Sequence, residues 1–311
     1  MRGVVPDSLT AALGVLGDLA ERDVPLGPMT TYRVGGAAAV LVRARSLDDL
    51  RVVAEASRVS GLPVLAVGRG SNMLVADSGF PGIAVSMVEL PERLEIDGST
   101  SVVTASAGIS LPVLARRTAA AGLTGFEWAV GVPGSLGGAV RMNAGGHGSD
   151  IAAALVDATV IDMEDDGIER LLTADDLGLA FRSSALPASC VVVEARLQLA
   201  PGDRARSERE ISEIVAWRRM NQPGGQNAGS VFVNPVPGEL SAGQLIDESG
   251  LRGLRVGSAH VSEKHANFIQ ADEDGTAADV HALMQLVRDR VEAATGWSLR
   301  SEIRLIGFDG R

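Results

Sequence analysis

The stretch that decides the fold is Gly131-Val132-Pro133-Gly134-Ser135-Leu136-Gly137-Gly138-Ala139-Val140-Arg141-Met142-Asn143-Ala144-Gly145-Gly146-His147-Gly148, in which seven of 18 residues are glycine. Glycine weakens the interior of helices and strands, so such density is unfavourable unless the backbone must approach another group closely. Interleaved apolar residues, among them Leu136 and Val140, can anchor the segment to a core, which argues against a flexible linker. The segment therefore predicts an extended cofactor laid along the backbone, without identifying which cofactor.

A second glycine turn, Gly68-Arg69-Gly70-Ser71-Asn72, follows the apolar strand predicted for 63–67. Backbone N–H groups in such a turn can hold a phosphate, or the turn can be an ordinary tight connection. A dinucleotide-binding fingerprint needs a third glycine where Met73 stands and then a helix, whereas 73–75 is typical of a strand. The sequence Gly-Lys-Ser/Thr is also absent, which excludes a phosphate loop of the Walker type. Phosphate binding and a plain turn both stay open from this motif alone.

The composition excludes several classes of protein. The 311 residues are 46% hydrophobic, which is too apolar for a disordered chain and is enough for two or three domains. A net charge of −11 argues against a nucleic-acid partner, because such a partner requires a basic surface. The single cysteine, Cys190, excludes an internal disulfide or a CxxC site, and the four histidines lack metal-site spacing, so no metal is expected. Because Lys264 is the one lysine, arginine must supply the other side-chain cations.

The N-terminal region is predicted to form an amphipathic helix over 9–20, capped by Asp7 or Ser8, rather than a signal sequence. No stretch reaches the roughly 18–20 apolar residues that a membrane span requires. We therefore expect a soluble, cytoplasmic protein with no membrane partner.

The rest of the chain alternates helix and strand signals, which predicts a mixed α+β fold. Pro201-Gly202-Asp203 is the clearest break in composition and predicts a domain boundary. The predicted helices cover 46–61, 110–121, 208–219 and 277–294, and the predicted strands include 32–42, 63–67, 73–75, a hairpin around 94–103, 155–161, 191–199 and 299–306.

Six motifs occur in a fixed order along the chain. They are Thr30–Gly36, Gly68–Asn72, Gly131–Gly148, Phe181–Ser184, Gly229–Pro235 and His260–Phe268. No single motif is specific, but the ordered set resembles the family of UDP-N-acetylenolpyruvoylglucosamine reductases of bacterial peptidoglycan synthesis. The resemblance covers roughly residues 25–307.

The resemblance implies a fold and a reaction. The implied fold is a FAD-binding domain of the vanillyl-alcohol-oxidase type, in two α/β subdomains, followed by an α+β substrate-binding domain. The implied reaction is the NADPH-dependent reduction of UDP-N-acetylglucosamine enolpyruvate to UDP-N-acetylmuramate, through non-covalent FAD, in a monomer. The implied segments are 1–29, an N-terminal helix and lead-in; 30–200, the FAD-binding domain; 201–298, the substrate-binding domain; and 299–311, a C-terminal strand that carries Glu302.

Individual site residues follow from the same resemblance. Ser230 would be the proton donor, Arg182 would bind the substrate carboxylate, and Glu302 would share a proton or orient a donor near the intermediate. Without the resemblance these residues would be interpreted as a turn serine, a solvated loop arginine and an exposed strand acid. Arg219 and Asn234 match substrate-binding positions. The implied FAD-binding residues are Tyr32, Gly68, Arg69, Gly70, Ser71, Asn72, Gly131, Pro133, Gly134, Ser135, Gly137, Gly138, Asn143, Ala144 and Gly145.

Three departures from the family's pattern bear on the site. Phe181 replaces a tyrosine that commonly precedes the catalytic arginine, and Val233 stands where a lysine or another polar residue is common. The chain also lacks the inserted loop with which longer members close a tyrosine over the substrate. Two other functions compete with the reductase: a different flavin oxidase or dehydrogenase on the same cofactor fold, and a non-catalytic nucleotide-binding module.

Overall fold

The turn Gly68–Asn72 directly follows a strand of a four-stranded sheet. In the computed structural model, which describes residues 6–308, the sheet order is β1-β2-β5-β3, with β1 antiparallel to β2 and the other neighbours parallel. The strand predicted from residue 32 begins only at Ala37. Gly35 and Gly36 lie against residues 75–79 instead, so closely that a Cβ on either would clash with that backbone. The strands are β1 (Glu21–Pro25), β2 (Ala37–Arg43), β3 (Val64–Val67) and β5 (Phe80–Ser86).

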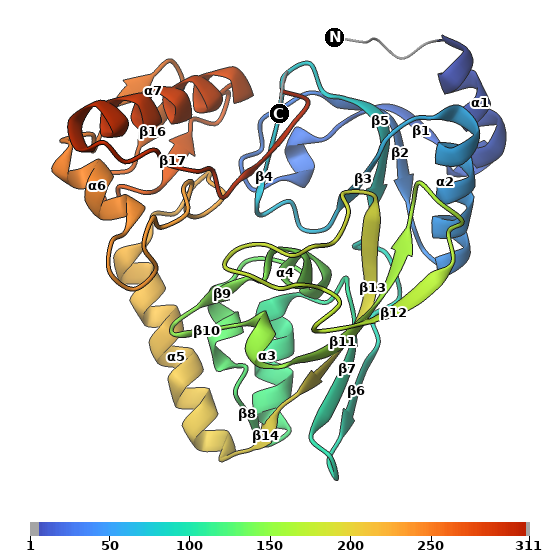
Figure 1. Ribbon diagram of the computed structural model, residues 1–311, viewed down its shortest axis with the longest axis horizontal. Coiled ribbons are helices and arrows are strands. Elements are labelled where there is room, and N and C mark those ends of the chain that lie inside the picture. The colour runs from blue at the N-terminus through green and yellow to red at the C-terminus, as the bar shows by residue number, and fades with distance from the viewer. Residues whose placement is uncertain (1–5, 309–311) are drawn as a thin grey trace.

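Two helices cover one face of this sheet (Figure 1). Ser46 caps the second of them through its side chain, and Gly61 ends it in the left-handed conformation, so the predicted helix is confirmed. The first helix starts one residue before Asp7, and therefore Asp7 and Ser8 lie in its first turn instead of capping it. The helices are α1 (Pro6–Leu16) and α2 (Leu47–Ser60).

A second sheet of five antiparallel strands, in the order β12-β11-β13-β7-β6, lies beneath the first in Figure 1. The predicted hairpin at Asp97-Gly98 is confirmed by the pairing of β6 with β7. Leu114 and Val140 of two helices share a hydrophobic cluster with Val103 of β7. The elements are β6 (Leu94–Asp97), β7 (Val102–Ser106), β11 (Leu155–Asp162), β12 (Glu169–Thr173), β13 (Cys190–Gln198), α3 (Leu111–Ala120) and α4 (Leu136–Met142).

Short elements complete this part of the chain, and one apolar cluster joins its two sheets. Ile161 of β11 and Val191 of β13 are buried with Val40 and Ile83 of the first sheet. The short elements are η1 (Gly17–Leu19), η2 (Gly27–Met29), β8 (Leu123–Thr124), η3 (Glu127–Gly131), β9 (Gly145–Gly146), β10 (Ser149–Asp150), η4 (Ile151–Ala153) and β14 (Ala200–Pro201).

The C-terminal part has its own core around a long helix. Val280, Leu283 and Val287 of this helix are buried against Val261 and Ile269 of a three-stranded sheet. The helix predicted over 277–294 is confirmed. The elements are α6 (Ala242–Glu248), β15 (Arg255–Val256), β16 (Ala259–Val261), β17 (Ile269–Ala271) and α7 (Ala277–Thr295).

Helix α5 (Arg204–Asn221) runs from the second sheet to the C-terminal part (Figure 1). Its buried residues Ile211 and Ile214 belong to the hydrophobic cluster of the second sheet. We therefore propose that the C-terminal domain begins after α5, later than the boundary predicted at residue 201. The outer ends of the first and last predicted segments, 1–5 and 309–311, lie outside the described residues.

The C-terminal end of the described chain returns to the turn Gly68–Asn72. Strand β18 (Arg304–Ile306) pairs in parallel with β4 (Met73–Val75), the strand predicted directly after that turn. Residues 299–303, predicted as part of the same strand, do not form one, and only an isolated bridge links Ser301 to Phe232. This return places Glu302 beside the glycine turn although 230 positions separate it from Asn72.

Candidate active site

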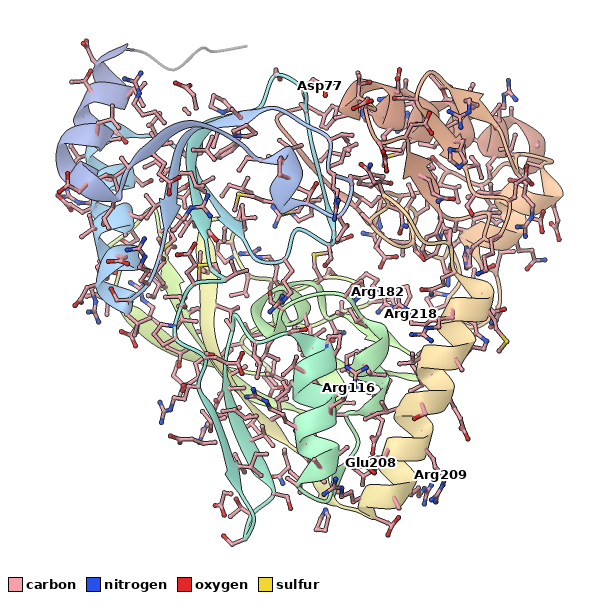
Figure 2. All side chains as sticks on the ribbon, turned by 180° about the vertical axis from the view of Figure 1, so that it is seen from behind. Asp77, Arg116, Arg182, Glu208, Arg209 and Arg218 are labelled. Atoms are coloured by element: carbon pink, nitrogen blue, oxygen red, sulfur yellow. The ribbon has the colours of Figure 1, made fainter. Side chains whose placement is uncertain are left out.

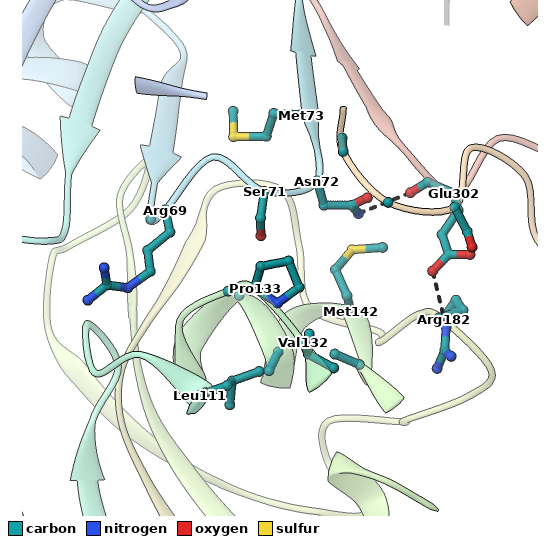
Figure 3. Close-up of a pocket in the computed structure, with 18 of the residues that line it drawn as sticks. Arg69, Ser71, Asn72, Met73, Leu111, Val132, Pro133, Met142, Arg182 and Glu302 are labelled. Atoms are coloured by element: carbon teal, nitrogen blue, oxygen red, sulfur yellow. Dashed lines mark hydrogen bonds and ion pairs between the residues drawn. The ribbon is translucent and has the colours of Figure 1, made fainter. Parts of the chain in front are cut away.

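A pocket of about 310 Å³ lies where these parts of the molecule meet. The turn Gly68–Asn72 and the glycine-rich segment both line it, and so do Ser230, Arg182 and Glu302. Figure 3 shows Ser71 and Asn72 on one side facing Pro133 and Val132 on the other, with Arg182 and Glu302 at one end. The structure therefore brings together three residues that lie far apart in the sequence.

The turn Gly68–Asn72 presents unpaired donors to this pocket. Within residues 6–308, none of its five backbone N–H groups donates a hydrogen bond to the protein. Gly70 has φ +59°, and a Cβ there would lie 2.2 Å from the backbone oxygen of Met29, so glycine is required. Unpaired N–H groups need an acceptor when they are buried, and a run of them in a tight turn favours an anionic group.

The glycine-rich segment forms the opposing wall, but it is not extended throughout. Residues 136–142 form helix α4, which was not predicted, with Ser135 as its cap. The two glycine regions approach each other closely, because a Cβ on Gly68 would lie 2.7 Å from Ser135 Oγ and one on Gly134 would lie 3.3 Å from Ser71 Oγ. Glycine at these positions lets the two segments pack against each other, so that both expose backbone to the same pocket.

Arg182 is held by the end of the glycine-rich segment. Its Nη2 donates to Gly145 O at 2.7 Å, its Nη1 donates to Asn143 O at 3.4 Å, and its Nε lies 3.1 Å from Glu302 Oε1. Arg182 also has φ +57°, a left-handed conformation that is unfavourable for a residue with a side chain. Phe181 stacks beneath the guanidinium, 4.9 Å from ring centroid to Cζ. These contacts fix the direction of the arginine before any ligand binds.

Glu302 sits at the meeting point of three segments. Its backbone oxygen accepts a hydrogen bond from Asn72 Nδ2 at 3.0 Å, and its backbone N–H donates to Val231 O at 2.8 Å. Burial raises the pKa of the Glu302 carboxyl above the ordinary range, and the Arg182 guanidinium opposes part of the rise. A carboxyl with a raised pKa keeps its proton to higher pH than an ordinary glutamate and can give it up to a strong base.

Ser230 is half-buried, and its hydroxyl makes no hydrogen bond within residues 6–308. It follows Gly229, which has φ +76° and whose N–H donates to Asn227 Oδ1 at 3.1 Å. The turn thus fixes the backbone of Ser230 and leaves its hydroxyl available to a ligand in the pocket.

Known protein families, curated relatives and a solved structure match this chain over most of its length. Residues 220–306 match the model of the UDP-N-acetylenolpyruvoylglucosamine reductase C-terminal domain, and residues 38–171 match a FAD binding domain. The reductase of Heliobacterium modesticaldum is 43% identical over 92% of this chain and 90% of its own length. That of Acidiphilium cryptum is 41% identical over 93% of this chain and 92% of its own. The reductase structure from Thermus caldophilus has a TM-score of 0.78 at 35% identity, covering 92% and 98% of the two chains.

The chain belongs to the UDP-N-acetylenolpyruvoylglucosamine reductase family. The resemblance stated from the ordered motifs is therefore confirmed. The predicted fold class is confirmed as well, because the FAD binding domain match falls on the two sheets and the C-terminal match covers the domain built around α7.

The resemblance pointed to the doublet Arg218-Arg219 and assigned Arg219 to the substrate, but it is Arg218 that the structure places at the pocket. Arg218 lines the pocket and is partly buried, which lowers the pKa of its guanidinium, whereas Arg219 is exposed and does not line it. Their positions on consecutive residues of α5 point the two side chains in different directions. Asn234 does line the pocket, and its Oδ1 also accepts a hydrogen bond from Ala242 N at the start of α6.

Three residues predicted to contact FAD do not line the pocket. Tyr32 is fully buried in the C-terminal core, where its hydroxyl donates to Ile269 O at 3.1 Å. Gly137 packs α4 against Ala107, the residue after β7, since a Cβ there would lie 2.7 Å from Ala107 Cβ. Asn143 ends α4, and its side chain ties down neighbouring backbone. The resemblance implied a FAD contact for each of them, whereas in the structure each makes contacts within the protein.

Two arginines of the pocket were not predicted. Arg304 and Arg141 both line it, and burial lowers the pKa of each guanidinium. The two are close enough for the charge of Arg304 to lower the pKa of Arg141 further. Arg141 lies inside the quoted glycine-rich segment and Arg304 lies two residues after Glu302, so proximity to those motifs was the available signal.

Phe181 and Val233, the two residues that depart from the family's pattern, have different surroundings. Phe181 keeps the stacking contact with Arg182 and is 39% exposed. Val233 is buried and does not line the pocket, and its N–H donates to Arg300 O at 2.9 Å. Over residues 6–308, no cluster of three or more His, Cys, Asp or Glu side chains could hold a metal ion. No helix in the same range has the length and apolar character needed to cross a membrane.

Proposed function

We propose that this protein reduces the enolpyruvyl ether of UDP-N-acetylglucosamine enolpyruvate to give UDP-N-acetylmuramate in peptidoglycan synthesis, with NADPH as reductant and FAD as a non-covalent cofactor. The observation that carries the proposal is that one pocket joins the unpaired amides of Gly68–Asn72 to Ser230 and to the Arg182–Glu302 pair. The names of the relatives support the choice of substrate.

The wall of the pocket suits FAD. The N–H groups of Gly68–Asn72, which have no acceptor within residues 6–308, match an anionic pyrophosphate, and both glycine regions expose backbone to the pocket that a flavin would occupy. Bound there, FAD would supply two-electron chemistry, taking a hydride from NADPH and passing it to the substrate. The buried Arg141 and Arg304 would add positive charge on the same side.

The Arg182–Glu302 pair would stabilise the charge that develops on the substrate. Addition of a hydride to the β-carbon of the enolpyruvyl group leaves an electron pair on the α-carbon, conjugated with the carboxylate. Arg182 is fixed by Gly145 O and Glu302, so its remaining N–H donors need no reorganisation to meet that charge. A protonated Glu302 would add a neutral donor beside it.

Ser230 would donate the proton that completes the reaction. A serine hydroxyl is a weak acid, but a carbanion next to a carboxylate is a stronger base, so the transfer runs in the required direction. The hydroxyl of Ser230 has no hydrogen-bond partner among residues 6–308, and Ser230 lines the pocket with Glu302. The proton goes to the α-carbon, and Ser230 then recovers a proton from solvent or from a neighbouring acid, so that one NADPH and one proton are consumed.

The proposal is tested in two half-reactions without oxygen. The purified protein, loaded with FAD, is first reduced with NADPH, and the loss of flavin absorbance is followed. The enolpyruvyl sugar nucleotide is then added, and we expect reoxidation of the flavin with formation of UDP-N-acetylmuramate. Bleaching by NADPH without reoxidation would instead indicate a different flavin oxidoreductase. A colourless protein that cannot be reconstituted with FAD would contradict any flavin function.

A further inference from the structure

Asn267 is buried and does not line the pocket. Its side chain hydrogen-bonds to the backbone of Phe232, two residues after Ser230. It is 3% exposed and precedes β17. Phe232 N donates to Asn267 Oδ1 at 3.0 Å, and Asn267 Nδ2 donates to Phe232 O at 2.8 Å. The N–H of Val231 donates to the backbone oxygen of Asn267 at 2.9 Å. The side-chain amide therefore acts as one peptide unit of a neighbouring strand, pairing with both polar groups of Phe232.

The opposite edge of the same segment holds Glu302. Glu302 N donates to Val231 O at 2.8 Å, and Val233 N donates to Arg300 O at 2.9 Å. Residues 231–233 thus lie between Asn267 on one side and residues 300–302 on the other. Ser230 begins this segment and Glu302 is bonded to it, so the backbone that Asn267 holds carries the two groups proposed to transfer protons.

Asn267 is itself held by a tight turn. The N–H of Asn267 donates to His265 Nδ1 at 3.3 Å, and Ser262 Oγ accepts from the N–H groups of Lys264 and His265. The ring of His265 packs on that of Phe268, with the centroids 4.6 Å apart. Phe268 lines the pocket, so the turn is anchored at the site it supports.

We propose that Asn267 is a positioning residue for proton transfer, which sets the places of Ser230 Oγ and the Glu302 carboxyl by fixing the Val231-Phe232 backbone. The inference rests on the proposed function. An amide is required because it is both acceptor and donor: an ionised carboxylate can accept from Phe232 N but cannot donate to Phe232 O, and an alanine does neither. The expected loss is confined to the step that uses the proton, since the flavin wall is built by other segments.

The experiment compares Asn267→Ala and Asn267→Asp with the wild type in separate half-reactions, with flavin content and melting temperature measured in parallel. Val287→Ala is the matched control, because Val287 is 1% exposed in the same hydrophobic cluster as Val231 and Phe232, and its apolar side chain cannot hydrogen-bond to residues 230–233. We expect NADPH to reduce both Asn267 variants at the wild-type rate, while reoxidation by the enolpyruvyl sugar nucleotide slows by on the order of 10²-fold, as a small misplacement of a reacting group does.

Asn267→Asp adds a readout that a purely structural role would not move. Burial raises the pKa of a carboxyl, and the protonated form can donate to Phe232 O in place of the amide. Relative to the wild type at each pH, reoxidation of Asn267→Asp should therefore recover as the pH falls. This variant also keeps the shape of asparagine, so it tests the inference where Asn267→Ala does not fold.

Three outcomes would overturn the inference. One is reoxidation of both Asn267 variants at the wild-type rate. Another is equal slowing of both half-reactions, as Val287→Ala would give if stability alone mattered. The third is a reoxidation rate of Asn267→Asp that stays low at every pH. Failure of the wild type itself to be reoxidised would overturn the proposed function, which separates the two claims.

Discussion

Glu302 is the residue whose protonation links the stability of the protein to its site. Because burial raises its pKa in the folded state, the folded protein holds a proton that the unfolded chain has lost, in the window from about 4.3 up to the raised value. The contribution of Glu302 to the free energy of unfolding therefore falls as the pH rises through this window, and the fall is complete above it.

Glu302→Gln should remove this dependence while keeping the size of the side chain. The difference in free energy of unfolding, variant minus wild type, should rise as the pH rises through this window, because only the wild type loses stability there. Urea unfolding at a series of pH values measures it. Parallel curves for the two proteins would show that the pKa of Glu302 is not raised in the folded state.

The three residues proposed to be catalytic illustrate what a sequence can and cannot predict. Ser230, Arg182 and Glu302 were identified by resemblance, and the structure places all three at one pocket. Their individual surroundings gave no such signal, since the left-handed backbone of Arg182 and its hold on Gly145 O depend on contacts distant in sequence. Asn267 could not be assigned a role at all, because its partner Phe232 lies 35 positions away.

Asp77 connects two elements of different domains. It lies in the loop between β4 and β5, and its carboxylate oxygens each accept a hydrogen bond at 2.9 Å, from Ala277 N and from Ala278 N. These N–H groups are among the free donors at the start of α7, where a negative charge is also favoured by the helix dipole. Figure 2 shows Asp77 at the junction of the two parts. The contact fixes the C-terminal domain to the strand that pairs with β18.

Asp77→Ala should lower the free energy of unfolding by about 1 kcal/mol, as for a lost helix cap, and should also raise the KM for the sugar nucleotide, because the C-terminal domain loses a fixed position. Thr276→Ala is the control: it removes the side-chain cap from Asp279 N on the same helix without touching the other domain. It should lower stability similarly and leave the KM unchanged. Equal KM values for all three proteins would show that the contact is only a cap.

Elements were predictable where their ends carry local signals. Ser46 and Gly61 bound α2 as their types require, and α7 shows the apolar spacing of a buried helix. Helix α4 was missed because Gly137 and Gly138 are poor helix formers, and tertiary packing against β7 overrides that preference. Strand β18 was predicted too long because its pairing partner, β4, decides where it begins.

The net charge of the whole molecule is negative, whereas the pocket is lined by several positively charged arginines. The chain carries a net charge of −11, yet its substrate and reductant are polyanions under the proposed function. The pocket resolves this locally, since Arg182, Arg218 and Arg304 all line it. Charges beyond a Debye length of about 8–10 Å are screened at ordinary salt, so these nearby arginines outweigh the distant acids. Net charge alone gave no indication of the site.

The pocket itself is a property of the complete fold. Its walls come from the first sheet, the glycine-rich segment, the end of α5 and the C-terminal domain, and β18 closes it by returning to β4. Local patterns predicted most of these pieces. Their convergence was available only through the resemblance, because pairings between residues hundreds of positions apart leave no periodic signal in the sequence.

Ser230→Ala is the variant that shows whether this pocket delivers a proton from Ser230 to the α-carbon of the substrate. Ser249→Ala, a serine of the same domain whose hydroxyl bonds to Leu245 O outside the pocket, is the control. The measurement is the rate at which the enolpyruvyl sugar nucleotide reoxidises the NADPH-reduced flavin without oxygen. We predict that Ser230→Ala is reduced normally and reoxidised about 10²–10⁴-fold more slowly than the wild type, while Ser249→Ala matches the wild type. Reoxidation of Ser230→Ala at the wild-type rate would show that Ser230 is not the proton donor.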